Sequence, residues 1–510
     1  MPGARTPKKK SGQKSGPKPG RKDAAPALLA RVNDQVTLEV YANGKVGAFV
    51  DGYAIELGTI SPGSVTRAKG FGEGLAITSF SPARKPADRE IELLARRLAR
   101  SGFLEYELVP ARGSALAAIE PQIPDYWPQI VKLGNSDAVA LSRFAYMRRR
   151  GNDLVLESPR APALFRFTDP KLTAAILALS TPQKIGALRR ERNFVGLALL
   201  GLLVACDILF KVDPKNDGLR VGEGDENLVL WDFHDLLFHT HSTEGRQANP
   251  LGGRYTYVGA IAPPAAVRAP WPGPPIDLQA LSPAAGAPAS PFTKLLGERR
   301  SVREFDEARP ITLAELAVLL DTTARVRSKW TMPLDFGDGN VGPDLDFTSR
   351  PYPAAGSAYE LELYLAVNNC EGLARGYYHY DADRHALTPI EARPQELEAL
   401  FSSASFAMDV DGTPQILVTI AARFNRVAWK YSAIAYSLIL KDVGVLLQTL
   451  YLASTDMGLG GCAIGTSNVD LFARMTGQPF HVEGPVGQFA LGRGIPGGDF
   501  GQAQASAPSQ

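Results

Sequence analysis

Two kinds of hydrophobic pattern alternate along the chain. Residues 30–60 alternate apolar and polar positions, and Asn43-Gly44 between two such runs is typical of a tight hairpin. Residues 88–109 begin with apolar positions at helical spacing, pass a glycine and end in a strand-like run. A helix, a glycine and a short strand are how a winged-helix unit ends, and a similar order recurs over residues 168–242. The pattern therefore predicts small winged-helix-like α/β units in the first half of the chain.

Composition divides the chain into five parts. Residues 262–291 are rich in Pro and Ala, which is a linker composition, and we place the main domain boundary there. Residues 292–497 alternate long helical patterns with apolar strands, which predicts a second, α+β unit. Residues 30–261 form the winged-helix-like region, and residues 1–29 and 498–510 are predicted to be disordered tails.

The charge balance argues against a nucleic-acid-binding protein. Apolar residues make up 45% of the chain, charged residues 21%, and the net charge is only +2, so no broad basic field exists. The first 22 residues carry eight Lys and Arg and no acid. They could attract an acidic partner, but we prefer to interpret them as a solvated tail.

The cysteines and apolar runs point to a cytoplasmic protein. Cys206, Cys370 and Cys462 are widely separated, which suggests neither a disulfide framework nor a cysteine-rich zinc site. The longest apolar run, residues 194–206, is shorter than the roughly 20 residues that span a bilayer and predicts a buried helix. The N-terminus lacks the apolar segment of a secretory signal.

A histidine cluster is the only candidate metal site. His239 and His241 stand two residues apart, close to His234, but no third ligand with suitable spacing is evident. We therefore expect a structural role for these histidines and no metal.

Guanidinium groups gather where the second unit opens. Arg299, Arg300, Ser301 and Arg303 lie within five residues, and two positive forks with a hydroxyl suit a phosphate dianion. A solvated basic turn is the alternative. Thr312 follows with a Glu three residues on, which predicts a capping box at a helix start.

Three further features could carry chemistry. Small residues in the turn at 353–356 let a backbone approach a flat ligand closely. Lys430 and Tyr431 stand side by side, just ahead of an apolar helical pattern that ends at Gly458. Gln448 lies inside that pattern, either as a polar core residue, which we favour, or as a ligand contact.

Five motifs in order resemble the flavin-dependent nitroreductase fold, and more narrowly the SagB/ThcOx-type dehydrogenases. Those enzymes oxidise thiazoline and oxazoline rings in ribosomally made peptides. Residues 230–246, ahead of the linker, resemble the same family. The motifs are R-R-S-V-R-E-F, P-x-A-G-x-x-Y-E-L-E-x-Y, G-x-Y-x-Y-x-x-x-x-H-x-L, Q-x-L-Y-L-A-x-x-x-x-G-L-G-x-x-x-I-G and A-L-G-R.

The resemblance implies FMN at the subunit interface of an entwined homodimer. The first motif would grip the phosphate and ribityl chain, and the turn would lie beside the isoalloxazine. Ala354 stands where the family usually has Ser, which loses a side-chain hydrogen bond but keeps a backbone contact. With Gln448 included, the candidate cofactor-binding residues are Arg299, Arg300, Ser301, Arg303, Pro353, Ala354, Ala355, Gly356, Gln448, Gly460, Gly461, Cys462 and Arg493.

The resemblance also makes Lys430 and Tyr431 the catalytic pair. Making an azoline aromatic removes a hydride to FMN N5 and a proton from the neighbouring carbon. Burial beside Tyr431 and an apolar wall would disfavour the charged amine and make Lys430 a base, with Tyr431 sharing or relaying the proton. The alternative is a lysine that extends to solvent from a helix start and a tyrosine packed in the core.

The implied activity is the oxidation of azoline to azole rings in a peptide, with O2 reoxidising FMN. The expected partners are the precursor peptide, clamped by residues 30–261, a cyclodehydratase and a second copy of the chain. Two alternatives stay open: an NAD(P)H-dependent nitro or quinone reductase, and a non-catalytic peptide-recognition subunit with a decayed flavin site.

Overall fold

The computed structural model describes ten stretches of the chain, which form two compact units. The N-terminal unit is Met1–Leu98, Phe103–Ile119 and Arg166–Asp169, and the rest is the C-terminal unit. The units therefore do not divide at the predicted linker, because residues 120–165 and 170–246 belong to the same unit as the C-terminal domain. The described residues are 26–50, 53–111, 114–212, 223, 226–246, 255, 257–281, 288–335, 337 and 341–495.

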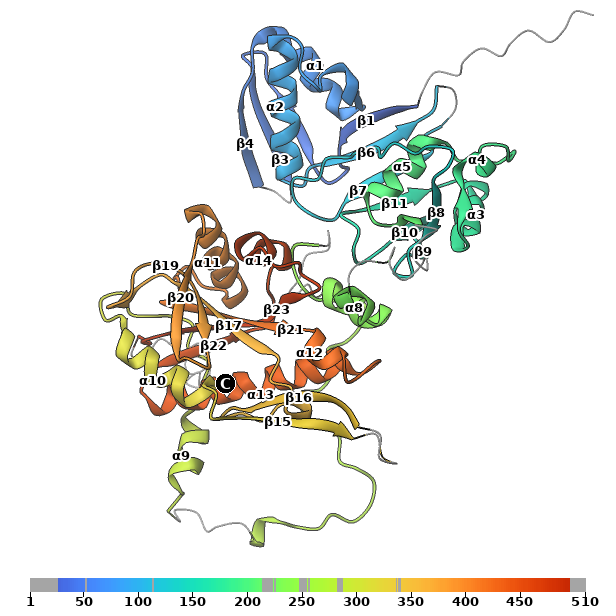
Figure 1. Ribbon diagram of the computed structural model, residues 1–510. Helices are drawn as coiled ribbons and strands as arrows, with labels where there is room; N and C mark the ends of the chain where they lie inside the picture. Colours follow the sequence, from blue (N-terminus) through green and yellow to red (C-terminus); the bar gives the residue numbers. More distant parts are fainter. Residues whose placement is uncertain are drawn as a thin grey trace, which may run out of the picture. The chain divides into compact units, whose positions relative to one another are not determined.

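The N-terminal unit contains antiparallel sheets and two helices (Figure 1). The predicted hairpin is confirmed, since β2 and β3 pair around Gly44, whose φ of 85° favours glycine. Strand β1 begins inside the predicted tail, because Leu28 and Leu29 pair with β6; the rest of that tail lies outside the described residues. Its elements are β1 (Ala27–Val32), β2 (Thr37–Val40), β3 (Lys45–Val50), β4 (Tyr53–Thr59), α1 (Val65–Lys69), β5 (Leu75–Ala76), α2 (Pro86–Arg100) and β6 (Leu104–Val109).

The first part of the C-terminal unit is a small α/β region, and its winged-helix identity stays a prediction. Three helices alternate with the short sheet β12-β8-β13, and the predicted buried helix is α5, with Leu199 to Leu203 buried. The elements are β8 (Ala138–Leu141), α3 (Pro170–Leu177), β12 (Gln183–Lys184), α4 (Ile185–Leu188), α5 (Leu197–Ala205) and β13 (Leu209–Val212), with the hairpin β9 (Tyr146–Arg150) and β10 (Asp153–Glu157) beside them in sequence. Strands β7 (Ala117–Pro121) and β11 (Ala163–Phe167) complete this half of the chain.

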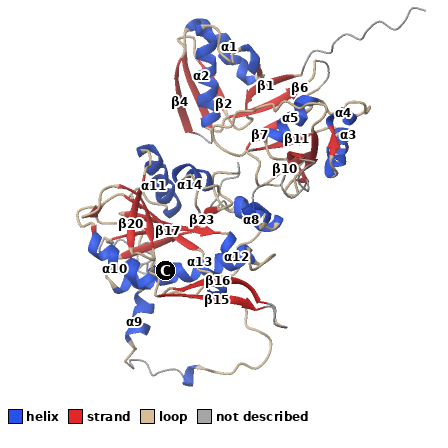
Figure 2. Cartoon of the chain, viewed as in Figure 1, coloured by secondary structure: helices blue, strands red, loops and turns tan. Residues whose placement is uncertain are grey.

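A six-stranded sheet in the order β20-β19-β17-β21-β23-β22 organises the C-terminal domain (Figure 2). Every neighbouring pair of strands in this sheet is antiparallel. The domain also contains a parallel pair, β14-β18, but that pair lies outside the six-stranded sheet. The strands are β14 (Ile311–Thr312), β15 (Ser328–Asp335), β16 (Val341–Ser349), β17 (Leu361–Val367), β18 (Cys370–Glu371), β19 (Gly376–Asp381), β20 (Ala386–Ile390), β21 (Ile416–Arg423), β22 (Gly460–Ile464) and β23 (Glu483–Gly492).

Helices cover both faces of this sheet. One core cluster joins α10 and α13 to residues of β17 and β21, and a second joins α11 and α14 to the alternate residues. The Thr312–Glu315 capping box is present at the start of α10, as predicted. The helices are α7 (Glu226–Val229), α8 (Phe233–His241), α9 (Pro291–Glu298), α10 (Leu313–Ala324), α11 (Pro394–Met408), α12 (Asn425–Ala428), α13 (Ala435–Asp456) and α14 (Val469–Thr476).

Helix α13 is the core helix of the domain. Among the described residues it alone is long and apolar enough, by length and composition, to cross a membrane. Ile439, Leu446 and Leu450 on its inner side are each at most 1% exposed. Burial against the sheet accounts for its apolar composition.

Helix α8 docks onto the C-terminal domain and supplies a cap to α13 (Figure 1). The N-cap residue of α13, Ile434, makes no capping side-chain hydrogen bond, and Asp235 Oδ2 instead accepts one from Tyr436 N at 3.1 Å. Trp231, just before α8, donates from Nε1 to His481 O at 2.7 Å. These bonds tie the stretch before the linker to the start of the core helix.

His239 has the structural role that we expected. It is fully buried, stacks on Trp231 and bonds through Nδ1 to Tyr436 Oη at 3.0 Å. Burial lowers its pKa to about 3, so the imidazole is neutral.

We predict that Asp235→Ala destabilises the C-terminal unit by about 1 kcal/mol, because it leaves the α13 terminus uncapped. The midpoint of denaturant unfolding should fall, whereas Asp411→Ala, at an exposed position, should leave it unchanged. Equal midpoints for the two variants would contradict the capping role.

Candidate functional site

The predicted phosphate-binding segment lies along two strands that are far away in sequence. Val302 N donates to Gly461 O at 2.8 Å, and Asp306 N donates to Arg493 O at 2.8 Å. Three of the five motifs therefore meet at one place, beside β22 and the end of β23.

Glycines allow this close approach. A Cβ on Gly460 would lie 2.6 Å from Val302 Cγ1, and one on Gly461 would lie 2.2 Å from the Phe489 ring. Both distances are shorter than contacts that real Cβ atoms make. The two glycines are therefore required by packing, whatever they bind.

A polar cluster forms around Tyr451, which our sequence analysis missed. Ser301 Oγ lies 2.8 Å from Tyr451 Oη, which also accepts from Ala463 N at 2.8 Å. The Cys462 thiol lies in the same cluster: burial raises its pKa, and the Arg303 guanidinium opposes that rise. The fourth motif of the sequence contains Tyr451, but a tyrosine at that position of an apolar helix is equally typical of a core residue.

The remaining arginines of the predicted site differ in environment. The Arg299 guanidinium lies 5.2 Å from the centre of the Tyr451 ring, and Arg300 is exposed. Arg493 Nη2 donates to both carboxylate oxygens of Glu315, at 2.8 and 2.9 Å, and this ion pair lowers the pKa of Glu315. Arg493 is thus already paired in the single chain.

The predicted turn and the predicted catalytic pair touch one another. Gly356 has a φ of 56°, and a Cβ there would lie 2.6 Å from Tyr431 Oη and 2.7 Å from Lys430 Nζ. Ala355 N donates to Asp442 Oδ2 at 2.8 Å, and this hydrogen bond fixes the turn to helix α13. Asp442 is a second residue that our sequence analysis missed. The Lys430 amine and the Tyr431 hydroxyl therefore both approach the backbone of Gly356, which has no side chain.

Two expectations about burial are wrong. Lys430 is exposed in the single chain, so the apolar wall that we expected around it is absent among the described residues. Gln448 is exposed on the outer side of α13 rather than in the core. The side chain of Pro353 and that of Ala354 line the same turn, and their contact with a cofactor stays a prediction.

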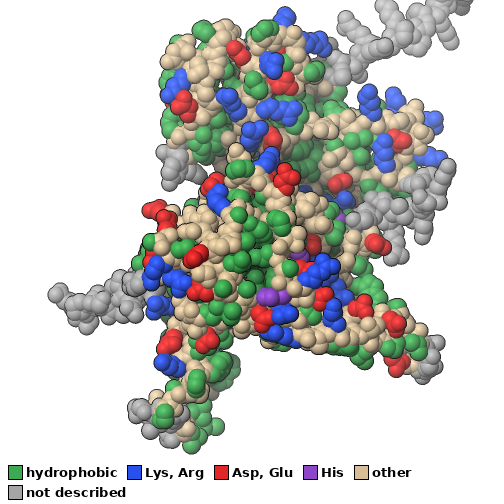
Figure 3. Space-filling view, turned by 60° about the vertical axis from the view of Figure 1, so that its left-hand side comes forward, with side chains coloured by type: hydrophobic (Ala, Val, Ile, Leu, Met, Phe, Trp, Pro, Cys, Tyr) green, Lys and Arg blue, Asp and Glu red, His purple; other side chains and the backbone are tan. Residues whose placement is uncertain are grey.

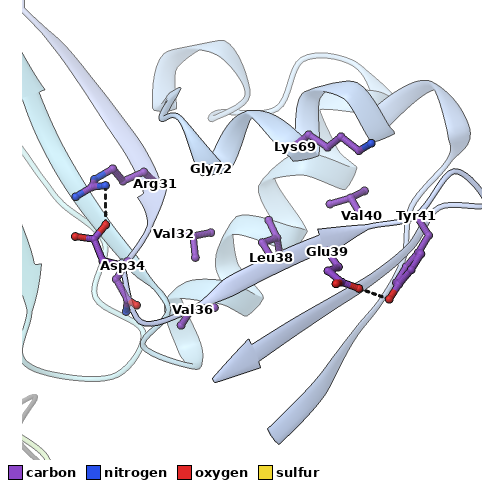
Figure 4. Close-up of a pocket in the computed structure, with 11 residues that line it drawn as sticks. Arg31, Val32, Asp34, Val36, Leu38, Glu39, Val40, Tyr41, Lys69 and Gly72 are labelled. Carbon is purple, nitrogen blue, oxygen red and sulfur yellow. Dashed lines mark hydrogen bonds and ion pairs between the residues drawn. The ribbon is translucent and has the colours of Figure 1, made fainter. Parts of the chain in front are cut away.

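A groove of about 580 Å³ lies in the N-terminal unit (Figure 4). It follows strand β2, which pairs only with β3 among the residues that the structure describes and so leaves one edge free. Its wall includes Val36, Leu38 and Val40 of that region, with Lys69 at the end of α1. Figure 4 also shows the Arg31–Asp34 and Glu39–Tyr41 pairs at its margins.

Charged side chains of both signs are interspersed on the face shown in Figure 3. The described residues contain no group of three His, Cys, Asp or Glu placed to hold a metal ion. The three cysteines are buried and free.

We predict that Gly461→Ala destabilises the protein by about 1–3 kcal/mol, because the new methyl group overlaps the Phe489 ring. Gly465→Ala is the matched control, since nothing lies within 4 Å of its added Cβ. Thermal unfolding of both variants measures the difference, and a Gly461→Ala midpoint equal to that of the control would refute the packing argument.

Two family models match this chain. Residues 139–248 match the cyanobactin oxidase ThcOx model, and residues 296–493 match the nitroreductase family. The second range contains the segment, the turn and the glycine strand described above. The first contains α8 and its contacts to α13.

Individual relatives agree with these matches. The chain is 29% identical over 171 residues to MJ1384 of Methanocaldococcus jannaschii, a protein named as a nitroreductase; the match covers 34% of this chain and 76% of that protein. It is 28% identical over 122 residues to the microcin B17-processing protein McbC of Escherichia coli, covering 23% of this chain and 44% of McbC.

A solved structure, the Escherichia coli microcin synthetase McbBCD complex with truncated pro-MccB17, is 17% identical with a TM-score of 0.38, over 53% of this chain and 97% of the matched one. At that score the likeness adds nothing to the assignment, which rests on the family models and the relatives. Residues 296–493 therefore form a nitroreductase-family domain, which makes the chain an oxidoreductase, and residues 139–248 are similar to the cyanobactin oxidase ThcOx, in agreement with the resemblance noted in the sequence.

Proposed function

We propose that this oxidoreductase uses FMN to convert thiazoline or oxazoline rings of a ribosomally made peptide into thiazole or oxazole, with O2 as the final electron acceptor. The observation that carries the proposal is the meeting of Lys430 Nζ and Tyr431 Oη over Gly356. A hydride acceptor alone cannot complete the reaction, because a ring proton must also leave.

The residues around Tyr451 fit an FMN phosphate. Arg303 and Ser301 lie together in the polar cluster, and Arg299 and Arg300 belong to the same short segment. Guanidinium groups and a hydroxyl are the donors that a phosphate prefers. When bound, FMN supplies the two-electron acceptor.

Lys430 is the proposed base. Its amine would take the proton from the ring carbon of the azoline, and Tyr431, in contact with the same glycine, would hold the amine in place and share the proton. Because Lys430 is exposed in one chain, a bound peptide or a second copy must cover it to exclude water.

Exposed apolar surface supports a homodimer. Helix α9 has no buried residue and exposes Phe292 and Leu296. The hairpin β15–β16 exposes Trp330, Met332 and Val341, although a two-stranded hairpin is marginally stable by itself. A second copy that covers these elements would also complete the FMN site.

The proposed substrate is a precursor peptide delivered with a cyclodehydratase. McbC is named for processing microcin B17, and the solved McbBCD complex holds truncated pro-MccB17. In this chain the groove along β2 suits an extended peptide segment, because the free edge of β2 offers unpaired backbone groups. We also propose a reducing, cytoplasmic location.

The deciding experiment combines a spectrum with an assay. Purified protein should show the visible absorbance of oxidised flavin, release FMN on heating and remove two hydrogens from an azoline-containing peptide under air, as detected by mass spectrometry. Turnover of flavin by NADPH without azoline oxidation would support a nitro or quinone reductase instead. A colourless protein that binds the peptide but cannot be reconstituted with FMN would support the recognition subunit.

We predict that Lys430→Ala lowers kcat for azoline oxidation by about 10²–10⁴-fold, the usual contribution of a general base. The flavin spectrum should be unchanged, because Lys430 is not among the proposed phosphate ligands. Lys184→Ala, at an exposed lysine of β12, should keep wild-type turnover. A Lys430→Ala enzyme with normal kcat would remove the lysine from the mechanism.

We predict that Leu38→Glu weakens binding of the labelled precursor peptide by about tenfold or more, because a buried charge in the groove is unfavourable. Fluorescence anisotropy measures the Kd. Leu93→Glu introduces the same charge at an exposed position of α2 in the same unit and should bind normally. Equal losses in both variants would place the peptide elsewhere.

A further inference from the structure

Glu360 is buried beneath the proposed active site without a hydrogen-bond partner. It is 0% exposed, and neither carboxylate oxygen has a partner among the described residues. It lies between the turn at 353–357 and the start of β17 at Leu361. Burying an ionised carboxylate without a partner costs free energy, so this group must be neutral or must interact with another ionisable group.

The acidic group that interacts with Glu360 is Asp442 of α13. Asp442 is 6% exposed, and its Oδ2 accepts the hydrogen bond from Ala355 N in the turn. Burial is the main cause of a raised pKa in both carboxyl groups. At Glu360 the negative charge of Asp442 adds to the rise, and the pKa reaches about 7. At Asp442 the pKa also rises, although the bonds from Ala355 N and Glu360 oppose that rise.

Asp442 is the better place for the remaining negative charge. It already accepts a backbone N–H, which favours its ionised form, whereas Glu360 has no donor of its own. A protonated Glu360 can then donate to Asp442. The pair thus carries one proton and one charge near neutral pH.

The other charged groups that face Glu360 are engaged elsewhere. Arg350 donates to Leu361 O at 2.9 Å, and Arg426 donates to Ala358 O at 3.1 Å. Both act on Glu360 only at longer range, and the buried Tyr352 hydroxyl, which has no partner among the described residues, adds no charge. No full counter-ion bonds to Glu360 in the described part of the chain.

The turn at 353–357 connects the carboxyl pair to Lys430 and Tyr431. Asp442 holds Ala355, and the next residue, Gly356, meets Lys430 Nζ and Tyr431 Oη. A shift of the turn would therefore change the backbone that Lys430 Nζ and Tyr431 Oη approach.

We propose that Glu360 and Asp442 form a proton-sharing carboxyl pair that positions the turn at 353–357 and, through it, Lys430 and Tyr431. Neither carboxyl group touches the reacting atoms, so both are positioning residues. Their effect on turnover rests on the proposed function, whereas their effect on the fold does not.

The sign of the pH effect follows from the raised pKa. Glu360 has an ordinary pKa near 4.3 when unfolded and about 7 in the folded chain. Its contribution to stability is fully present below the unfolded value and is lost as pH rises through about 7. Above that pH two buried charges repel, and Asp442 holds Ala355 less firmly.

Glu360→Gln tests the proposal, because glutamine keeps the size and a donor to Asp442 but cannot titrate. The thermal midpoint of the wild-type protein, as purified, should fall between pH 6 and pH 8.5 by several degrees more than that of Glu360→Gln. The control Glu371→Gln, at an exposed position, should follow the wild type. Parallel curves for all three proteins would overturn the proposal.

A pH profile of kcat adds a readout that a purely structural residue would not move. Wild-type azoline oxidation should fall at alkaline pH, approaching about tenfold per pH unit. Glu360→Gln should lose this fall and keep the acidic limb that a general base produces. Should Glu360→Gln not fold, Asp442→Asn, which retains an acceptor for Ala355 N, should likewise remove the alkaline fall.

The two readouts separate the two proposals. A pH-dependent midpoint that Glu360→Gln abolishes, in a protein that oxidises no azoline, would uphold the carboxyl pair and refute the function. Azoline oxidation with an alkaline limb that survives in both variants would uphold the function and refute the pair.

Discussion

The proposed active site depends on one tight turn, in which the backbone of Gly356 faces two side-chain ends with nothing between them. A left-handed φ of 56° makes the glycine necessary, and the distances to Tyr431 Oη and Lys430 Nζ leave no room for a Cβ. Ala355 N fixes the turn to α13 through Asp442. The backbone of this turn, which is bonded to the core helix, therefore borders the space in which the ends of Lys430 and Tyr431 lie.

The start of α13 is in turn set by residues from ahead of the linker. Asp235 caps the helix, and Trp231 and His239 pack against Phe424 and Tyr436 on either side of the Lys430–Tyr431 loop. This arrangement gives a physical reason for the family match at 139–248: that segment is part of the wall that holds the loop. It also explains why the compact units do not divide at the Pro/Ala-rich stretch. The described residues 257–279 are exposed throughout, yet the chain on both sides of them packs into one unit.

Much of the local structure followed from local signals. The capping box at Thr312, the hairpin at Asn43-Gly44 and the long helix ending before Gly458 each depend on neighbouring residues, so the sequence was sufficient. Asp442 and Tyr451 were missed because their roles depend on partners 87 and 150 residues away, which no periodicity reveals. Gln448 was misplaced because an apolar pattern of this length does not tell which side of the helix meets the sheet and which meets solvent or another chain.

The exposure of Lys430 could not be predicted for the same reason, because the sequence does not show which surfaces meet solvent and which meet another chain. This exposure affects the role of Lys430 as the proposed base. The proposed base must be shielded from water, and the described residues of the single chain do not supply that shield. The chain exposes apolar surface on α9 and on the β15–β16 hairpin, and both belong to the domain that carries the base. If those surfaces close over the site when a second copy or the peptide binds, the same binding step that recognises the substrate also removes water from Lys430. The lysine would then become a competent base only after the ring that it deprotonates is in place.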